Sequence, residues 1–307
     1  MNRHVFKSTI LPVLAAAIWG TAFVGQSMCA GKIPPFTFNA LRSFIAFALL
    51  LPLSYVIDAL KRRRGAEVPT VDKRNLIAGS LATGVFLAVA SNLQQAALID
   101  TTAGKAGFVT ALYVVLVPVL GALLLRKRVG WRVALSIAVA VAGLWLLCIR
   151  GRLQLRPSDL LLLLCALFFS FQIMSVDHFS ARTDGVRLSC GMFLVAGVIS
   201  AALAALLETP TVSGVVECIW PLLYVAVFSS CIAYTLQIVA QKEGDPTIVS
   251  LLMSLESVFA VLGGAVILGD RLTIREYIGC ALMLAAVVLA QLPASEKPCS
   301  PRKTVVK

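Results

Sequence analysis

Ten long apolar segments dominate this chain and restrict the folds available to it. Each is close to the roughly 20 residues that a helix needs to cross the hydrocarbon core of a bilayer. The segments cover approximately residues 9–29, 35–58, 75–98, 103–125, 130–149, 158–178, 188–207, 217–240, 247–268 and 273–292. The short connections between them leave no room for a soluble catalytic domain, an ATPase cassette or a large receptor ectodomain. The sequence therefore predicts an all-α membrane protein with ten transmembrane helices.

Composition favours a membrane protein over a soluble one. Hydrophobic residues make up 59% of the 307 residues, charged residues make up 14%, and the mean hydropathy is +0.91. Soluble domains average roughly 45–50% apolar and about 25% charged residues. The net charge of +12 does not indicate a nucleic-acid partner, because the basic residues lie in short connections such as 61–64 and 126–128. Nucleic-acid binding would need a basic face on a soluble module, so we expect no nucleic acid.

The basic residues also predict the orientation of the chain. With the N-terminus in the cytoplasm, most of the 27 Lys and Arg fall on the cytoplasmic side, as the positive-inside rule requires. We therefore expect a multi-pass protein of the cell (inner) membrane with both termini in the cytoplasm. Residues 9–29 imitate a signal peptide but lack a small-x-small cleavage site, which indicates an uncleaved first span. Residues 293–307 are polar and are expected to form a disordered cytoplasmic tail.

Cysteine and histidine usage indicates neither a metal nor a cofactor. The eight cysteines contain no Cys-x-x-Cys pair, and most lie within apolar segments, where a thiol is usually a small buried hydrophobe. His4 and His178 have no spaced carboxylate cluster beside them, as a hydrolytic zinc site would require. We expect no cofactor, no metal and no disulfide framework.

A weak internal repeat relates the two halves of the chain. When the chain is compared with itself at a shift of 143 residues, several positions match. Apolar residues match by chance in an apolar chain, so only the polar and glycine matches are informative. Those matches are Gln94 with Gln237, Gly121 with Gly264, and Arg128 with Arg271. We predict one five-span repeat over 9–149 and a second over 158–292. Because five is odd, the second copy enters the membrane inverted, which is a known design of transporters.

Short motifs along both halves carry a family resemblance. They are Ala17-Ile18-Trp19-Gly20-Thr21-Ala22-Phe23, Leu41-Arg42-Ser43-Phe44, Thr101-Thr102-Ala103-Gly104, Tyr234 with Gln237, Leu255-Glu256, and Gly269-Asp270-Arg271-Leu272-Thr273. Over about residues 9–292 the chain resembles the drug/metabolite transporter (DMT) superfamily, in its EamA-like family of ten-helix transporters. The resemblance implies two inverted five-helix EamA-like repeats. It specifies the substrate poorly, because relatives are described as moving amino acids, other metabolites or sugar nucleotides.

Two positions depart from the pattern of that family. Glu256-Ser257 stands where the family often has Glu-Pro, and Gly269-Asp270 stands where it often has Gly-Glu. Without the proline, no residue in the ninth span requires a kink there.

Polar side chains within the spans are the candidates for function, because polar groups are costly in hydrocarbon. Trp19 and Gln26 share one helix face, as do Asn39 and Arg42, and the third span carries the densest polar cluster. The candidate substrate-binding residues are Trp19, Gln26, Asn39, Arg42, Asn92, Gln94, Gln95, Tyr113, Gln172, Tyr234, Gln237 and Glu256. Interhelical hydrogen bonding is the alternative role for the amides, and packing is the alternative for the aromatic residues. We expect a cavity between spans one, three, four, six, eight and nine, with the repeat-related Gln94 and Gln237 facing it.

Arg42 and Glu256 are the ionisable residues that lie deepest in predicted spans. At 1.5 Å per residue, Arg42 lies roughly 10 Å into span two and Glu256 roughly 14 Å into span nine. They either pair with each other or each faces a charge on the substrate. The alternative for Arg42 is a structural arginine that satisfies carbonyl groups or snorkels outward. The alternative for Glu256 is a carboxylate that bonds a polar group of another helix.

These observations predict a secondary transporter that moves a small polar solute by alternating access, as a metabolite or amino-acid exporter. Proton coupling through Glu256, exchange and uniport are all allowed, as is a homodimer. The alternatives are a membrane-embedded enzyme of lipid metabolism and a channel. An enzyme would need paired carboxylates or a metal cluster, and a channel would need a ring of charges or carbonyls. We see neither pattern and expect a protein that is not an enzyme.

Overall fold

The structure is a computed structural model of the chain, and it describes residues 6–63, 72–101, 103–126, 129–148, 156–267 and 273–291. Every regular element in these ranges is helical. The helices are η1 (Phe6–Ile10), α2 (Leu11–Cys29), α3 (Pro35–Arg63), α4 (Lys73–Ala97), α5 (Ala103–Ala111), α6 (Tyr113–Leu125), α7 (Trp131–Cys148), α8 (Pro157–Ser180), α9 (Gly185–Leu207), α10 (Val212–Glu217), α11 (Ile219–Tyr224), η2 (Val225–Ala233), α12 (Tyr234–Glu243), α13 (Pro246–Met253), α14 (Glu256–Ile267) and α15 (Ile274–Gln291).

Eight helical segments in the described ranges are long and apolar enough to cross a membrane. They are Ser8–Cys29, Pro35–Arg63, Lys73–Ala97, Lys105–Leu125, Pro157–Ser180, Gly185–Leu207, Ile219–Glu243 and Pro246–Gly263. This confirms a multi-pass, all-α membrane fold. The two other predicted spans coincide with the shorter apolar helix α7 and with α15, so ten crossings stay a prediction. The predicted tail at 293–307 lies outside the described residues.

The second span is longer than predicted, because its helix continues past residue 58 to Arg63. Lys61, Arg62 and Arg63 occupy its last turn, where the negative end of the helix dipole favours cations. Lys61 also pairs with Asp58 and with Asp184. The basic residues that end the apolar segment therefore extend the helix instead of ending it.

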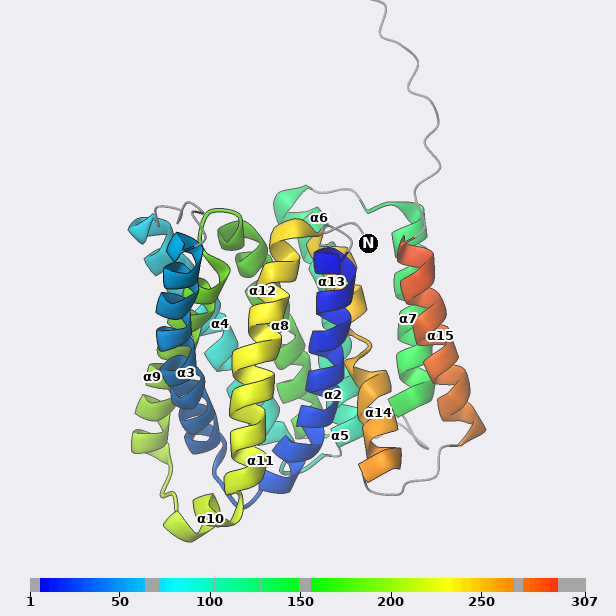
Figure 1. Cartoon of the computed structure of the whole chain (residues 1–307). Helices are drawn as coiled ribbons and strands as arrows, with labels where there is room; N and C mark the ends of the chain where they lie inside the picture. Colours follow the sequence, from blue (N-terminus) through cyan, green and yellow to red (C-terminus); the bar gives the residue numbers. More distant parts are fainter. Residues whose placement is uncertain are drawn as a thin grey trace, which may run out of the picture.

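Helices that are far apart in the sequence pack side by side. α3 packs along α9, α4 along α8 and α9, α7 along α15, and α2 against α14. Figure 1 shows α3 with α9 at one side of the bundle and α7 with α15 at the other, with α2, α8 and α12 between them. Residues from the two halves of the sequence therefore meet in the middle of the bundle.

Three of the spans are interrupted at mid-depth. The fourth span breaks at Leu112 between α5 and α6, and the ninth breaks at Ser254-Leu255 between α13 and α14. Both breaks are tightened by bonds of the 3₁₀ type, from the Leu112 amide to the Val109 carbonyl and from the Leu255 amide to the Leu252 carbonyl. The ninth span is thus interrupted although Ser257 stands where the family often has a proline, so the break does not depend on that residue. The eighth span contains the π-helix η2.

A glutamate from the second half of the chain caps the start of α3. The Glu208 carboxylate accepts hydrogen bonds from the amides of Phe36 and Thr37, at 2.8 and 2.7 Å, and from the Thr37 hydroxyl at 2.7 Å. The first amides of a helix have no partner within the helix, and a negative charge is favourable there. Glu208 therefore ties the start of the second span to the end of α9.

We expect Glu208→Ala to lower the free energy of unfolding by about 1–3 kcal/mol, because hydrogen bonds to a charged group contribute roughly that much. Glu217→Ala is the matched control, since its ion pair with Lys32 is solvent-exposed and such pairs contribute about 0–1 kcal/mol. Thermal unfolding in detergent would compare the two variants. Equal melting temperatures would contradict the capping role of Glu208.

Candidate functional site

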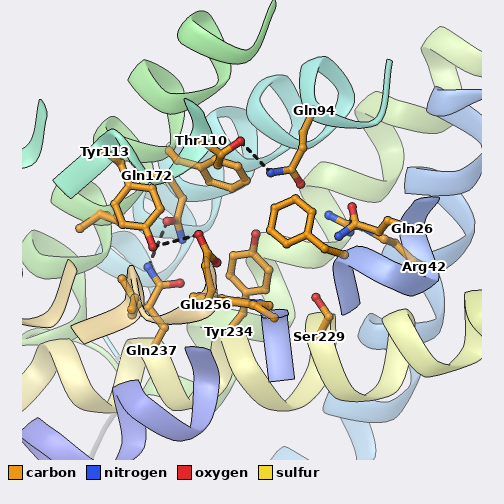
Figure 2. A pocket seen from close by; sticks show the side chains of 15 residues that line it. Gln26, Arg42, Gln94, Thr110, Tyr113, Gln172, Ser229, Tyr234, Gln237 and Glu256 are labelled. Carbon is orange, nitrogen blue, oxygen red and sulfur yellow. Dashed lines mark hydrogen bonds between the residues drawn. The ribbon is translucent and has the colours of Figure 1, made fainter. Parts of the chain in front are cut away.

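A central cavity lies where the interrupted spans meet α2, α4 and α8 (Figure 2). Its lining residues are Trp19, Phe23, Gln26, Arg42, Gln94, Thr110, Tyr113, Phe169, Gln172, Ile173, Ser229, Tyr234, Gln237, Met253 and Glu256. They come from all six spans that the sequence analysis assigns to the cavity, and Arg42 adds the second span. The wall therefore combines amides, aromatic rings, an arginine and a glutamate at the centre of an apolar bundle.

Most of the candidate residues predicted from the sequence lie around this cavity. Those that line it are Trp19, Gln26, Arg42, Gln94, Tyr113, Gln172, Tyr234, Gln237 and Glu256. Their role in binding stays a prediction, because position alone does not show that a substrate contacts them.

Asn39, Asn92 and Gln95 do not line the cavity. The Asn39 amide donates to Asn92 Oδ1 at 2.8 Å, and the Asn92 amide donates to Ser200 Oγ at 2.9 Å. Gln95 donates to the Gln26 carbonyl oxygen at 3.3 Å. These three residues instead join neighbouring helices by hydrogen bonds, which was the alternative role considered for the amides.

Several lining residues were absent from the predicted set. They are Phe23, Thr110, Phe169, Ile173, Ser229 and Met253. Thr110 stands one helical turn before Tyr113, on the same helix face. The shift of 143 residues aligns Thr110 with Met253, so the repeat could have indicated both residues. Ser229 had no such signal, because it lies in the π-helix η2. There the Tyr234 amide donates to the Ser229 carbonyl, five residues earlier. An α-helix has a four-residue spacing, so an α-helical pattern places Ser229 on a different face of the span.

Arg42 is a buried cation that is only weakly bonded. Its side chain is 3% exposed, and Nη1 donates to Gln26 Oε1 at a long 3.5 Å. The guanidinium carbon lies 5.9 Å from the centre of the Phe38 ring, a cation–π distance. The Nε atom is buried and has no hydrogen-bond partner among the described residues. An arginine with a spare donor in a buried cavity is suited to bind an anion.

Glu256 is the acidic residue in the same cavity. It is 5% exposed and is the first residue of α14, directly after the break in the ninth span. Its carboxylate accepts a hydrogen bond from the Tyr113 hydroxyl at 3.2 Å. Arg42 and Glu256 form no ion pair in the described part of the chain, and Figure 2 shows Tyr234 between them. Each charge therefore faces the cavity separately.

Amides and aromatic rings form the rest of the wall. Gln94 donates to Thr110 Oγ1 at 3.3 Å, and Gln237 donates to Gln172 Oε1 at 3.2 Å. The Trp19 and Tyr234 rings meet edge to face with centres 4.9 Å apart. These contacts leave Gln237 Oε1 and Trp19 Nε1 buried and without hydrogen-bond partners among the described residues. The described residues contain no group of three or more side chains that could hold a metal.

Comparisons with known proteins identify the family of the chain. The model of the EamA-like transporter family matches residues 7–149 and again residues 156–292. An uncharacterized transporter of Archaeoglobus fulgidus is 30% identical over 91% of this chain and 84% of its own length. Another of Methanothermobacter thermautotrophicus is 27% identical, over 86% and 78%. A chloroplastic WAT1-related protein of Arabidopsis thaliana is 23% identical, over 90% and 67%.

One solved crystal structure has the same fold, with a TM-score of 0.73, 21% identity, and coverage of 93% of this chain and 96% of the other. That likeness concerns the fold alone. The two family matches together cover nearly the whole chain, and two of the relatives are named as transporters. The chain belongs to the EamA-like transporter family of the DMT superfamily and is a multi-pass membrane transporter.

Proposed function

We propose that this protein is a secondary transporter for a small zwitterion such as an amino acid, with export as its direction. The observation that carries the proposal is the separation of Arg42 and Glu256 within one cavity. Burying two charges without pairing them costs stability that the fold does not recover. A solute with a carboxylate at one end and an ammonium at the other would satisfy both charges at once.

The neutral part of the wall fits the same solute. Trp19, Phe23 and Tyr234 supply apolar surface between the two charges, while Gln94 and Gln237 supply amide groups. Small-molecule sites generally combine a mostly apolar lining with a few placed polar groups. The side chain of a small amino acid would lie against the rings while the charged ends bind Arg42 and Glu256.

We further propose ten crossings arranged as two inverted halves, which is the basis of alternating access. The helix contacts support this arrangement because spans that hold the same position in the two predicted repeats pack against each other. Spans two and seven pack together as α3 and α9, and spans five and ten pack together as α7 and α15. The shift of 143 residues also places the break at Leu112 on Leu255 and places Tyr113 on Glu256. The Tyr113–Glu256 hydrogen bond would then join the same point of each half.

A second cavity supports an entrance at the end of the bundle that carries the N-terminus. It is lined by the end of α6, the start of α13, and Met174 and Asp177 of α8. Met174 directly follows Ile173, which lines the central cavity. In the proposed orientation this end is cytoplasmic, so solute would enter from the cytoplasm. The carboxylates of Asp177 and Asp245 at this mouth would favour an ammonium group.

Counterflow in liposomes tests the proposal. The purified protein would be reconstituted and loaded with unlabelled amino acids, and the uptake of labelled ones would be measured. Each amino acid would be compared with its decarboxylated amine and with its deaminated acid. We expect saturable counterflow of zwitterions and at least a tenfold lower rate for either analogue. No saturable flux from correctly folded protein would overturn transport, and equal rates for all three forms would overturn the zwitterion.

Gln94→Ala and Gln237→Ala are each expected to lower counterflow about tenfold, because a hydrogen bond contributes roughly 0.5–1.5 kcal/mol and every 1.4 kcal/mol is a factor of ten. Gln241→Ala is the matched control. Gln241 is equally buried on α12, but its amide donates to the Ile173 carbonyl at 3.0 Å and it does not line the cavity. Normal transport by both cavity variants would remove these amides from the site.

A further inference from the structure

Two cysteines from distant parts of the chain meet at the end of the bundle opposite the N-terminus. Cys29 is the last residue of α2, and Cys218 stands between α10 and α11, at the lower end of Figure 1. Both are buried, at 0% and 2% exposure, in one cluster with Ile33 and Leu222. The Cys218 sulfur lies 3.8 Å from the carbonyl oxygen of Met28, the residue before Cys29. The fold thus brings together two side chains that 189 residues separate.

We propose that Cys29 and Cys218 form a disulfide that ties the outer end of α2 to the start of α11. The flanking contacts hold the two segments together without this bond, because Lys32 pairs with Glu217 and because Cys218 packs in the same cluster as Ala22 and Val225. The two segments are therefore adjacent before any bond between the cysteines forms.

The chemistry requires an oxidant, which the compartment supplies. Two thiols lose two protons and two electrons as the sulfur–sulfur bond forms, and a protein disulfide of an oxidoreductase is reduced to two thiols in exchange. Disulfides form and persist on the oxidising side of a cell membrane and are rare in the cytosol. The inference therefore rests on the proposed orientation, which places this end of the bundle on the outer side of the membrane.

Other cysteines in the described ranges lack one or more of these conditions. Cys190 and Cys231 lie near each other, but both lie within candidate membrane spans, whereas Cys29 is the last residue of its span and Cys218 directly precedes one. Cys165 lies behind Thr110 of the central cavity, with its sulfur 3.9 Å from the Thr110 hydroxyl oxygen. They provide internal controls, since we expect all three to remain reduced.

Intact mass measurement tests the proposal directly. Membranes would be quenched in acid, unfolded and alkylated, with and without prior reduction. We expect the reduced sample to carry two more alkyl groups than the unreduced one. This difference should vanish in Cys29→Ser and in Cys218→Ser, and it should persist in Cys190→Ser and Cys231→Ser. Cys29→Ala and Cys218→Ala provide second variants if serine prevents folding.

A second experiment tests the formation of the disulfide independently of the orientation of the protein in the membrane. Purified protein would be equilibrated with mixtures of reduced and oxidised glutathione, and a fusion reporter at the C-terminus would measure its side of the membrane. Full alkylation of both cysteines in both arms would overturn the proposal. A disulfide that forms only with glutathione would support the pair and overturn the orientation. Neither arm measures transport, so a failed transport assay would leave this result unchanged.

Discussion

Arg42→Met is expected to abolish most counterflow while leaving the protein as stable as the wild type, or more stable. Arg42 donates only one long side-chain hydrogen bond, to Gln26, and its Nε has no partner in the described part of the chain. A charged residue at the centre of a span costs roughly 2.5–3.5 kcal/mol on insertion scales. Methionine is shorter but keeps an unbranched apolar stem, and it removes the cost of burying the charge. Stability and transport should therefore change independently.

The loss of transport follows from the bonds that a substrate carboxylate would make. A hydrogen bond to a charged group contributes about 1.5–3 kcal/mol, and every 1.4 kcal/mol is a factor of ten. We expect the ratio of maximal rate to half-saturation concentration to fall by about 10- to 100-fold. The same change should remove the preference for the zwitterion over its decarboxylated amine, because the group that recognises the carboxylate is gone.

Arg42→Lys is the control, since it retains the charge but loses the planar pair of donors. We expect it to transport at an intermediate rate and to keep the preference for the zwitterion. The measurements are counterflow with both substrate forms and thermal unfolding of each variant. If Arg42→Met still prefers the zwitterion over the amine, Arg42 does not bind the carboxylate. If it unfolds at a much lower temperature, Arg42 is a structural residue.

The sequence was sufficient to find the two charges and most of the amides of the cavity. Ionisable residues are so rare in apolar spans that Arg42 and Glu256 were visible by composition alone. Gln94 and Gln237 were visible because the repeat aligned them. In each case the signal was a polar residue within an apolar span. Such a residue stands out because its burial in the bilayer is costly, and this cost does not depend on how the helices pack.

What the sequence could not supply was the direction in which each side chain points. Asn92 and Gln94 are near neighbours on α4 and are equally polar, yet Asn92 bonds Ser200 between helices while Gln94 lines the cavity. That difference depends on which helix packs against which face of α4. Ser229 was missed because a π-helix changes the register of the eighth span. The meeting of Cys29 and Cys218 is likewise a product of tertiary packing alone.

The breaks in spans four and nine show how the local backbone and the site are connected. The residue that follows each break, Tyr113 or Glu256, carries the side chain that reaches into the cavity. A short 3₁₀ turn inside a helix is often a hinge. In the proposed mechanism a rotation at either turn would move one of these two side chains and alter their mutual hydrogen bond, so the conformation of each half would depend on that of the other.

Gly20→Ala is expected to have the largest effect on folding of any small substitution near the cavity. A Cβ atom at Gly20 would lie 2.6 Å from the Glu256 carbonyl oxygen, 2.6 Å from Phe259 Cβ and 2.7 Å from the Ala260 amide nitrogen. Two of these are backbone atoms of α14, which cannot turn aside as a flexible side chain can. Overpacking typically costs about 1–3 kcal/mol, and we expect the upper end of that range or more.

The same substitution should reduce transport in the protein that still folds. α2 carries Trp19 next to Gly20, and α14 begins with Glu256, so forcing the two helices apart displaces two cavity residues together. This accounts physically for a glycine after the tryptophan in the first-span motif, since glycine alone permits the close approach. We expect lower yield, a lower melting temperature and weaker counterflow from Gly20→Ala.

Gly107→Ala distinguishes this mechanism from a general intolerance of larger residues in the spans. Gly107 lies in α5, where an added Cβ would meet only Ser257 Oγ, at 4.0 Å. Alanine is favoured over glycine within a helix by about 1 kcal/mol, so this variant should be as stable as the wild type or more stable. Equal stability of the Gly20 and Gly107 variants would show that α2 and α14 can separate without cost. Glu256 would then not be held in place by the packing of these helices, and its position in the cavity would depend on its bond to Tyr113 alone.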